Sequence, residues 1–329
     1  MNMRTASADG APEPCRCAPC NPGRMGAAVT PLLILAIVAL NYIPSVLFAL
    51  DMGIDAVTVA LVVVFHLLLG LMIVAWSFTC ATDPGVPPER WQRQMAGEAA
   101  AGREVPRICA KSGLYKPPRS HYCSVTGRLT LNMDHFCPWV VNTVGFYNRK
   151  FFVLFLFYTL LATSWVLLTS VPLLLQLKST PGALRALERR LGPSRYMAAC
   201  MAVILDAALV VMLSCFCPFH VRMVLLNETT IEGPSPDFHV GVGRNWRQVM
   251  GSNPVLWFLP VYGGGPEGDG IHWPSRLVKS HAEKADDFAH AGRANEERHA
   301  ARPSQEKGPL LGGRSPGEYS DSSSTEPEV

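Results

Sequence analysis

The sequence has little charge for its length, and the charge it has is nearly balanced. The formal net charge of the 329 residues is +3, and charged residues make up 17% of the chain. No basic stripe interleaved with aromatic residues is present, which excludes the usual kind of nucleic-acid-binding surface. We therefore expect no nucleic acid among the partners.

The signatures of a secreted protein are also missing. Ten cysteines are present, but they do not form an even, regularly spaced framework, which argues against a disulfide scaffold. Residues 1–27 contain Pro, Gly and Cys without an apolar core, unlike a cleavable signal peptide. Cys15, Cys17 and Cys20 have ligand-like spacing without a nearby partner. A mobile tail with exposed thiols is favoured there, and a lipidated or metal-binding cluster stays open.

Long apolar runs are what the sequence does have. Hydrophobic residues make up 49% of the chain and gather into runs that can cross a bilayer, for which roughly 20 apolar residues are needed. We expect an all-α integral membrane protein with four transmembrane helices, over 27–50, 56–78, 151–177 and 196–226. A polar domain over 79–150 separates helices two and three, and a segment over 227–279 follows helix four. Residues 1–26 and 280–329 are expected to be disordered.

Basic residues indicate which side of the membrane each loop faces. The short loop 51–55 between the first two spans has no Lys or Arg, whereas 79–150 is rich in both. We therefore place 79–150 and both termini in the cytosol. The loop between the third and fourth spans runs against this asymmetry, because it carries basic residues on the side expected to be lumenal: Lys178, Arg185, Arg189, Arg190 and Arg195.

The polar domain contains a candidate nucleophile beside a candidate base. His135 and Cys137 are two residues apart, so in an extended chain their side chains point to the same face. Pro138 biases Cys137 toward extended backbone. An imidazole next to a thiol can generate the reactive thiolate. Asp134 would need a local bend of the chain to reach the imidazole.

Several motifs give the chain a specific family resemblance. Residues 134–139, read as DHFCPW, resemble the signature of the DHHC protein S-acyltransferases, with Phe136 where that family usually has a second histidine. The flanks KPPRSHYC over 116–123 and NTVGFYN over 142–148 agree with it. Further motifs of the family are matched by Asp83, Pro84 and Gly85, by Thr229, Thr230 and Glu232 (TTxE), and by Asn245 in the segment NWRQVMG.

The resemblance implies the chemistry and the partners. His135 would be the general base, and Asp134 would hold its tautomer. Cys137 would attack the thioester of palmitoyl-CoA, the co-substrate, and pass the acyl group to cysteines of membrane-associated proteins at the bilayer. Trp139 would shield the thiolate or anchor at the interface. Basic residues are candidates for the phosphates of CoA, with a solvated, lipid-facing belt as the alternative: Lys116, Arg119, Arg128, Arg149 and Lys150.

The sequence departs from the family at the metal ligands. The family's cysteine-rich domain usually binds two zinc ions, each through three Cys and one His. Here only Cys109 and Cys123 stand at ligand positions, and one thiolate does not hold a structural zinc ion. We predict no metal cofactor at either site, leaving open a rearranged site of Cys80, Cys109, His121 and Cys123. The remaining ligand positions are occupied by other residues: Ser112, Tyr122, Thr126, Leu129, Phe136 and Thr143.

Two other functions compete with the acyltransferase. A non-catalytic membrane adaptor or scaffold of the same fold is the main alternative, because most zinc ligands are missing. A small transporter or channel using His66 and Asp206 is the other, but internal repeats and broken-helix pairs are absent. The two residues could also bond to each other between helices. Golgi, endoplasmic reticulum and plasma membrane are all compatible locations, and family habit favours the Golgi.

Overall fold

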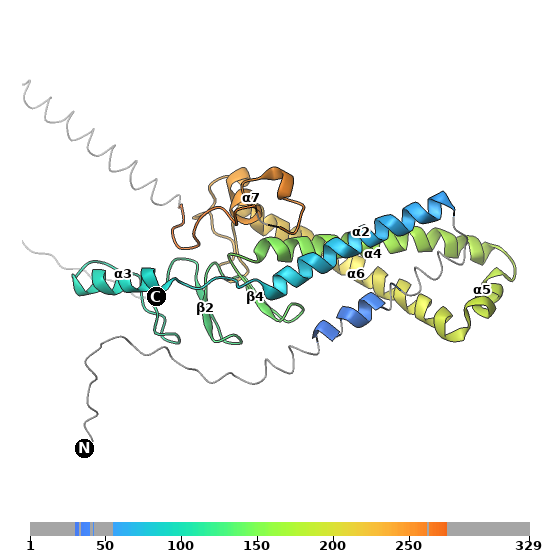
Figure 1. Cartoon of the computed structure of the whole chain (residues 1–329), viewed down its shortest axis with the longest axis horizontal. Coiled ribbons are helices and arrows are strands. Elements are labelled where there is room, and N and C mark those ends of the chain that lie inside the picture. Colours follow the sequence, from blue (N-terminus) through green and yellow to red (C-terminus); the bar gives the residue numbers. More distant parts are fainter. Residues whose placement is uncertain (1–29, 33, 40–41, 43–54, 262, 275–329) are drawn as a thin grey trace, which may run out of the picture. The chain divides into compact units, whose positions relative to one another are not determined.

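The computed structural model describes residues 30–32, 34–39, 42, 55–261 and 263–274 (Figure 1). The segments predicted to be disordered, 1–26 and 280–329, and most of the first predicted span, 27–50, lie outside these residues. Helices and strands follow in chain order: α2 (Ala56–Ala81), α3 (Glu89–Ala100), β1 (His121–Cys123), β2 (Arg128–Thr130), β3 (His135–Cys137), β4 (Asn142–Val144), α4 (Arg149–Ser179), α5 (Ala183–Leu191), α6 (Pro193–Leu226), α7 (Val242–Met250) and the 3₁₀ helix Pro254–Leu256.

Three helices form the apolar part of the protein. Within the described residues, α2, α4 and α6 are long and apolar enough to cross a membrane, and residues 30–39 form a shorter apolar helix. α4 is the central helix, since it packs against both α2 and α6. Large apolar side chains on the outer faces, such as Leu67, Leu168 and Val211, are left exposed. Such exposure is expected of helices that face lipid, so the protein is a mostly helical membrane protein.

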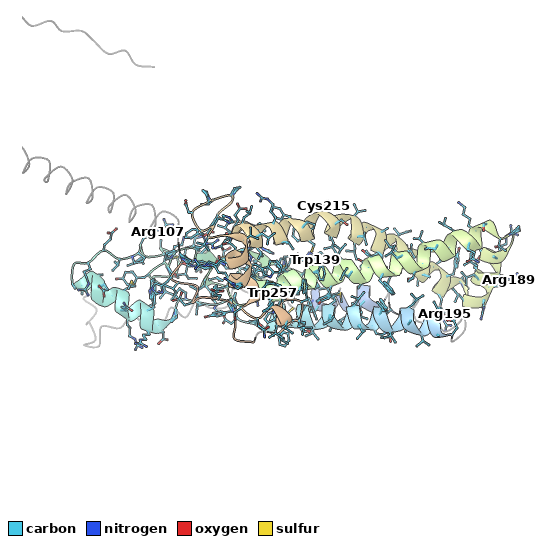
Figure 2. The ribbon with its side chains drawn as sticks, turned by 90° about the horizontal axis from the view of Figure 1, so that it is seen from above. Arg107, Trp139, Arg189, Arg195, Cys215 and Trp257 are labelled. Carbon is cyan, nitrogen blue, oxygen red and sulfur yellow. The ribbon has the colours of Figure 1, made fainter. Side chains whose placement is uncertain are left out.

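Local sequence explains where these helices begin and end. Asp55 caps α2, because its carboxylate accepts a hydrogen bond of 2.6 Å from the backbone N–H of Thr58. α6 ends at Asn227, whose φ of 56° is the left-handed conformation common after a helix. Arg189 of α5 and Arg195 of α6, two of the basic residues that run against the charge asymmetry, lie at the opposite end of the helices from Trp139 (Figure 2).

The domain between α2 and α4 is not helical throughout. It carries two antiparallel hairpins, β1–β2 and β3–β4, so the expected all-α class holds for the long helices and not for this domain. A small apolar core joins Trp91 of α3, Leu131, Phe146 and Ile271. Residues 271–273 thus pack onto the domain from beyond α7.

Two asparagines attach the hairpins to the end of α2. The side-chain amide of Asn142 donates to the carbonyls of Thr79, Cys80 and Thr82 at 2.9–3.1 Å. The amide of Asn148 donates to the carbonyls of Thr79 and Thr82 at 3.4 Å and to that of Thr143 at 2.9 Å, and its oxygen accepts from Gly145 N–H at 2.8 Å. The last carbonyls of a helix have no partner within the helix, so these side chains complete α2 and fix the domain on it.

Glycine at position 145 is required by close packing. A Cβ built there would lie 2.9 Å from the backbone oxygen of Leu131 and 2.8 Å from Cγ2 of Thr130. We expect Gly145→Ala to lower the unfolding free energy by about 1–3 kcal/mol, because a backbone neighbour cannot move aside. Gly97→Ala in α3 is the matched control: nothing lies within 4 Å there, and alanine favours a helix. The melting temperatures of both variants would be measured in detergent, and equal values would contradict the argument.

His66 and Asp206 do not form the pair that the sequence allowed. His66 Nδ1 contacts the carbonyl of Val62 at 2.7 Å, and its Nε2 contacts the hydroxyl of Tyr42 at 3.1 Å. The carboxylate of Asp206 is buried in α6, and neither of its oxygens has a hydrogen-bond partner in the part of the chain that the structure describes. A histidine bonded between helices, the interpretation favoured for His66, agrees with these contacts.

Candidate active site

Asp134, His135 and Cys137 lie together on and beside β3. The left-handed backbone of Asn132, with φ of 43°, turns the chain just before the strand. The carboxylate Oδ2 of Asp134 then lies 2.6 Å from Nδ1 of His135. In the strand, His135 and Cys137 share a face. The local bend that the interaction required is therefore present.

The thiol of Cys137 lies in an apolar environment. It is buried in a cluster that includes Phe152 and Leu156 of α4 and Leu213 of α6. The ring of Phe152 also forms a T-shaped contact with that of His135, with ring centroids 5.1 Å apart. The nucleophile candidate thus faces the packed apolar helices, while the His135 side chain keeps 27% of its surface exposed.

The electrostatics favour a charged pair of Asp134 and His135. Burial lowers the pKa of His135. Its hydrogen bonds with Asp134 and Cys137, and the negative charges of these two residues, outweigh burial and raise the pKa to about 9. Burial raises the pKa of Asp134, but the hydrogen bond from His135 and the charges of Arg149 and His135 lower it to about 2. His135 is therefore an imidazolium at neutral pH, which is the form that stabilises a neighbouring thiolate.

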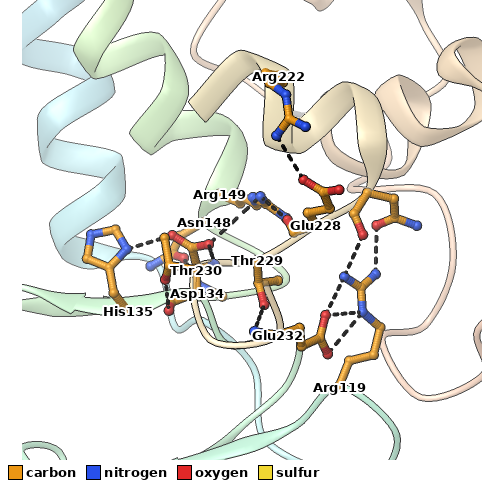
Figure 3. A network of polar contacts seen from close by, with 12 residues as sticks. Arg119, Asp134, His135, Asn148, Arg149, Arg222, Glu228, Thr229, Thr230 and Glu232 are labelled. Carbon is orange, nitrogen blue, oxygen red and sulfur yellow. Dashed lines mark hydrogen bonds and ion pairs between the residues drawn. The ribbon is translucent and has the colours of Figure 1, made fainter. Parts of the chain in front are cut away.

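A loop after α6 holds Asp134 in place (Figure 3). The backbone N–H of Thr230 donates to Oδ1 of Asp134 at 2.9 Å, and the Thr230 hydroxyl donates to the Asp134 carbonyl at 2.5 Å. Nη2 of Arg149 lies 3.9 Å from the same Oδ1. Thr230, 96 residues away in sequence, thus fixes the carboxylate that orients His135.

Arg119 links the domain to the same loop. Its guanidinium, with 0% of its side chain exposed, bonds to the carboxylate of Glu232 at 2.8 Å. It also donates to the side chain and carbonyl of Asn227 at 2.7 and 2.8 Å, and it lies over the rings of Phe238 and Trp273. Glu232 N–H in turn donates to the hydroxyl of Thr229. The residues 229–232 are therefore anchored at both ends, on Asp134 and on Arg119.

We expect Arg119→Ala to cost about 3–5 kcal/mol of unfolding free energy, because it leaves the carboxylate of Glu232 without its buried partner. Arg128→Ala is the matched control. Arg128 is exposed and pairs with Asp83 at 2.6 Å, and surface pairs contribute about 0–1 kcal/mol. The melting temperatures of both variants in the same detergent would measure the difference. Equal melting temperatures would show that Arg119 is not a structural cation.

Comparison with known proteins gives the family. A family model described as DHHC palmitoyltransferase matches residues 103–235. The chain is 36% identical over 247 residues to probable protein S-acyltransferase 13 of Arabidopsis thaliana, covering 69% of this chain and 80% of the relative. It is 31% identical over 264 residues to palmitoyltransferase ZDHHC20 of Homo sapiens, covering 69% and 70%. The chain belongs to the DHHC palmitoyltransferase family. It is thereby an acyltransferase, as the resemblance implied.

The zinc ligand positions of the DHHC family are filled by hydrogen bonds and packing. Cys123 is buried; burial raises the pKa of its thiol, but hydrogen bonds with Thr126 and Thr143 lower it below the usual value. Phe136 pairs with Thr143 across β3–β4, and Tyr122 pairs with Leu129 across β1–β2. One thiol with two hydroxyls does not fit a structural zinc site. Within the described ranges no group of three or more His, Cys, Asp or Glu could hold a metal, the rearranged site included. Absence of zinc stays a prediction that metal analysis would test.

Three of the basic residues predicted to contact CoA are buried and have partners inside the protein, which favours a structural role for them. Arg119 is enclosed as described. Arg149 is buried and donates to the Glu228 carbonyl at 2.6 Å. Lys150 is buried and its amino group donates to the carbonyls of Leu256 and Val261. Partner carbonyls and the aromatic rings around Arg119 come from beyond α6, which the local sequence does not reveal.

The other candidates stay accessible. Lys116 is half-buried and Arg128 exposed. Trp139 is 48% exposed, while its backbone carbonyl accepts a hydrogen bond from the Trp76 indole of α2. Asp83 pairs with Arg128 and accepts from Gly85 N–H at 2.9 Å, and Gly85, at φ 103°, lies against the ring of Tyr147. The Asp-Pro-Gly motif thus packs on the NTVGFYN segment.

Two residues of the site escaped the sequence analysis. One is Asn227, which accepts a hydrogen bond from Arg119 and donates one to Gln248 of α7 at 2.7 Å. The other is Phe152, whose ring contacts that of His135. A polar residue directly after the apolar run of α6 was an available signal for Asn227. Asn245 donates to the carbonyl of Leu225 at 2.7 Å, which ties α7 to the end of α6. Phe152 had no signal, because it reads as one more apolar residue of a membrane span.

Proposed function

We propose that the protein transfers a fatty acyl group, palmitoyl in particular, from acyl-CoA to cysteines of membrane-associated proteins, through a thioester on Cys137. The observation that carries this proposal is the 2.6 Å contact of Asp134 with His135, which maintains an imidazolium beside the thiol on the same strand. An imidazolium–thiolate pair is a nucleophile at neutral pH, and a buried cysteine without such a pair is inert.

Two acyl transfers complete the reaction. In the resting pair the proton of Cys137 already resides on His135, and the Cys137 thiolate attacks the carbonyl carbon of the thioester. The CoA sulfur leaves and takes the proton from His135, so that CoA departs as a thiol. The thiol of a substrate cysteine then gives its proton to His135 and attacks the thioester on Cys137. That thioester breaks, which restores the Cys137 thiolate beside the protonated His135.

The surroundings of Cys137 suit both halves of the acyl donor. The thiol lies in the cluster with Leu156 and Leu213, next to α4 and α6, where an acyl chain could lie among apolar side chains. Lys116, Arg128 and Trp139 remain for the water-soluble CoA, since the other basic candidates are enclosed. We place the domain in the cytosol and the protein in the Golgi or another membrane of the secretory route, with residues 27–50 as the first of four spans.

Acyl labelling tests the proposal. The purified full chain in detergent is incubated with an alkyne-bearing palmitoyl-CoA, and the labelled peptide is identified after digestion. Label on Cys137 that hydroxylamine removes is expected, and Cys137→Ser should carry none. Cys215→Ser, at an exposed cysteine of α6 (Figure 2), is the matched control and should label as the wild type does. A folded wild-type chain without label would favour the adaptor instead.

A further inference from the structure

A second histidine lies beside His135, from a distant part of the chain. His220 is on α6 and is 2% exposed. Its ring centroid lies 5.8 Å from that of His135, with an angle of 41° between the planes. No motif singled out this residue, and the reaction proposed above does not use it.

Aromatic rings surround His220. Phe152 of α4 forms T-shaped ring contacts with both histidines, with centroids 5.1 Å from His135 and 5.0 Å from His220. Phe216 and Phe219, which precede it in α6, have their centroids 4.5 and 5.4 Å from the His220 ring. His135, His220 and Phe152 therefore form a triangle of rings in mutual contact, built from β3, α6 and α4.

Three charged groups act on His220 in this triangle. His135 is the cation within it, and the Asp134 carboxylate, just before β3, and the Arg149 guanidinium of α4 act on His220. A cation is attracted to the face of an uncharged aromatic ring, most strongly where water is excluded. A second positive charge on His220 would repel the imidazolium instead. The arrangement is thus favourable when His220 is neutral and His135 is protonated.

We propose that His220 is a positioning residue for the reaction at Cys137: its neutral ring, with that of Phe152, holds the plane of the His135 imidazole toward Asp134 and stabilises its protonated form. Asp134 fixes His135 through Nδ1 alone, which leaves rotation about that bond. Rings packed beside the imidazole restrict that rotation. The proposal rests on the proposed function of Cys137, but the contact itself does not.

Alkylation of Cys137 by iodoacetamide tests the role without acyl-CoA. At pH 6.5 the rate depends on the imidazolium, whereas at pH 9.5 an ordinary thiol also ionises. We expect His220→Ala to slow alkylation at pH 6.5 by about 2- to 30-fold, the range of a cation–π contact, because an imidazolium that is free to turn stabilises the thiolate less, and to leave the rate at pH 9.5 unchanged. His220→Phe keeps a ring and should stay within about twofold of the wild type. His66→Ala, a histidine of another membrane helix, is the matched control and should behave as the wild type.

The outcomes separate the two proposals. Wild-type rates for His220→Ala at pH 6.5 would overturn the positioning role, as would equal slowing at both pH values or failure of His220→Phe to restore the rate. If the wild type alkylates as expected but never accepts palmitoyl from CoA, the proposed function fails, while a slow His220→Ala still supports the role of its ring.

Discussion

Substitution of His135 by alanine is expected to slow thioester formation at Cys137 by about 10²- to 10⁴-fold, which is the usual contribution of a positioned general base. Without the imidazole, the buried thiol has no group to take its proton and no cation to stabilise the thiolate. The rate of acyl loading from palmitoyl-CoA at neutral pH would be measured on purified chains. Because the His135 side chain is 27% exposed, free imidazole in the buffer should enter the vacated space and restore part of the rate.

His272→Ala provides the control for this variant. His272 forms the same kind of pair with Asp269, also at 2.6 Å, but on the surface, with 78% of its side chain exposed. It should load at the wild-type rate. If His135→Ala loaded within about twofold of the wild type while remaining folded, His135 would not be the base, and the mechanism proposed for Cys137 would be wrong.

Asp134→Asn is expected to move the pH at which Cys137 reacts. In the wild type, the hydrogen bond with Asp134 and its charge outweigh burial and hold the pKa of His135 near 9, so the imidazolium persists from acid pH up to about pH 9. Asparagine removes the charge, and burial then favours the neutral ring. A thiol without a cation beside it is only about 1% thiolate at pH 6.5, so we expect alkylation there to fall roughly 100-fold and to recover only as the pH approaches about 8.5.

The rate of iodoacetamide alkylation from pH 5.5 to 9.5 would measure this shift. Asp269→Asn, which alters the exposed pair with His272, should leave the profile unchanged. Asp134→Asn also leaves Arg149 without its nearest carboxylate, so the variant is expected to melt earlier. A profile identical to the wild type, in a variant that remains folded, would show that Asp134 does not maintain the imidazolium.

The long helices could be predicted closely from the sequence. Apolar runs over 56–78, 151–177 and 196–226 correspond to α2 over Ala56–Ala81, α4 over Arg149–Ser179 and α6 over Pro193–Leu226. A run of apolar residues is a local property, and a chain that must satisfy its backbone polar groups without water forms a helix. The hairpins were not predicted, because strands of three residues leave too little periodicity to detect.

The hydrogen-bond partners of the basic side chains could not be predicted from the sequence. Arg119, Arg149 and Lys150 read as surface cations near a phosphate ligand, yet each donates to acceptors supplied by residues 227–261. A buried cation needs partners, and those partners are carbonyls and carboxylates brought in by the fold from about 80–110 residues away.

By itself, the sequence determined that this chain belongs in a membrane and that a thiol stands two residues after an imidazole, because apolar runs and strand alternation act over neighbouring residues. Only the tertiary structure decided which groups act on that imidazole: Thr230 holds the carboxylate of Asp134, and Phe152 and His220 pack against the ring. These contacts join segments that are far apart in the chain. They exist only once α4 and α6 have packed beside the hairpin that carries Cys137.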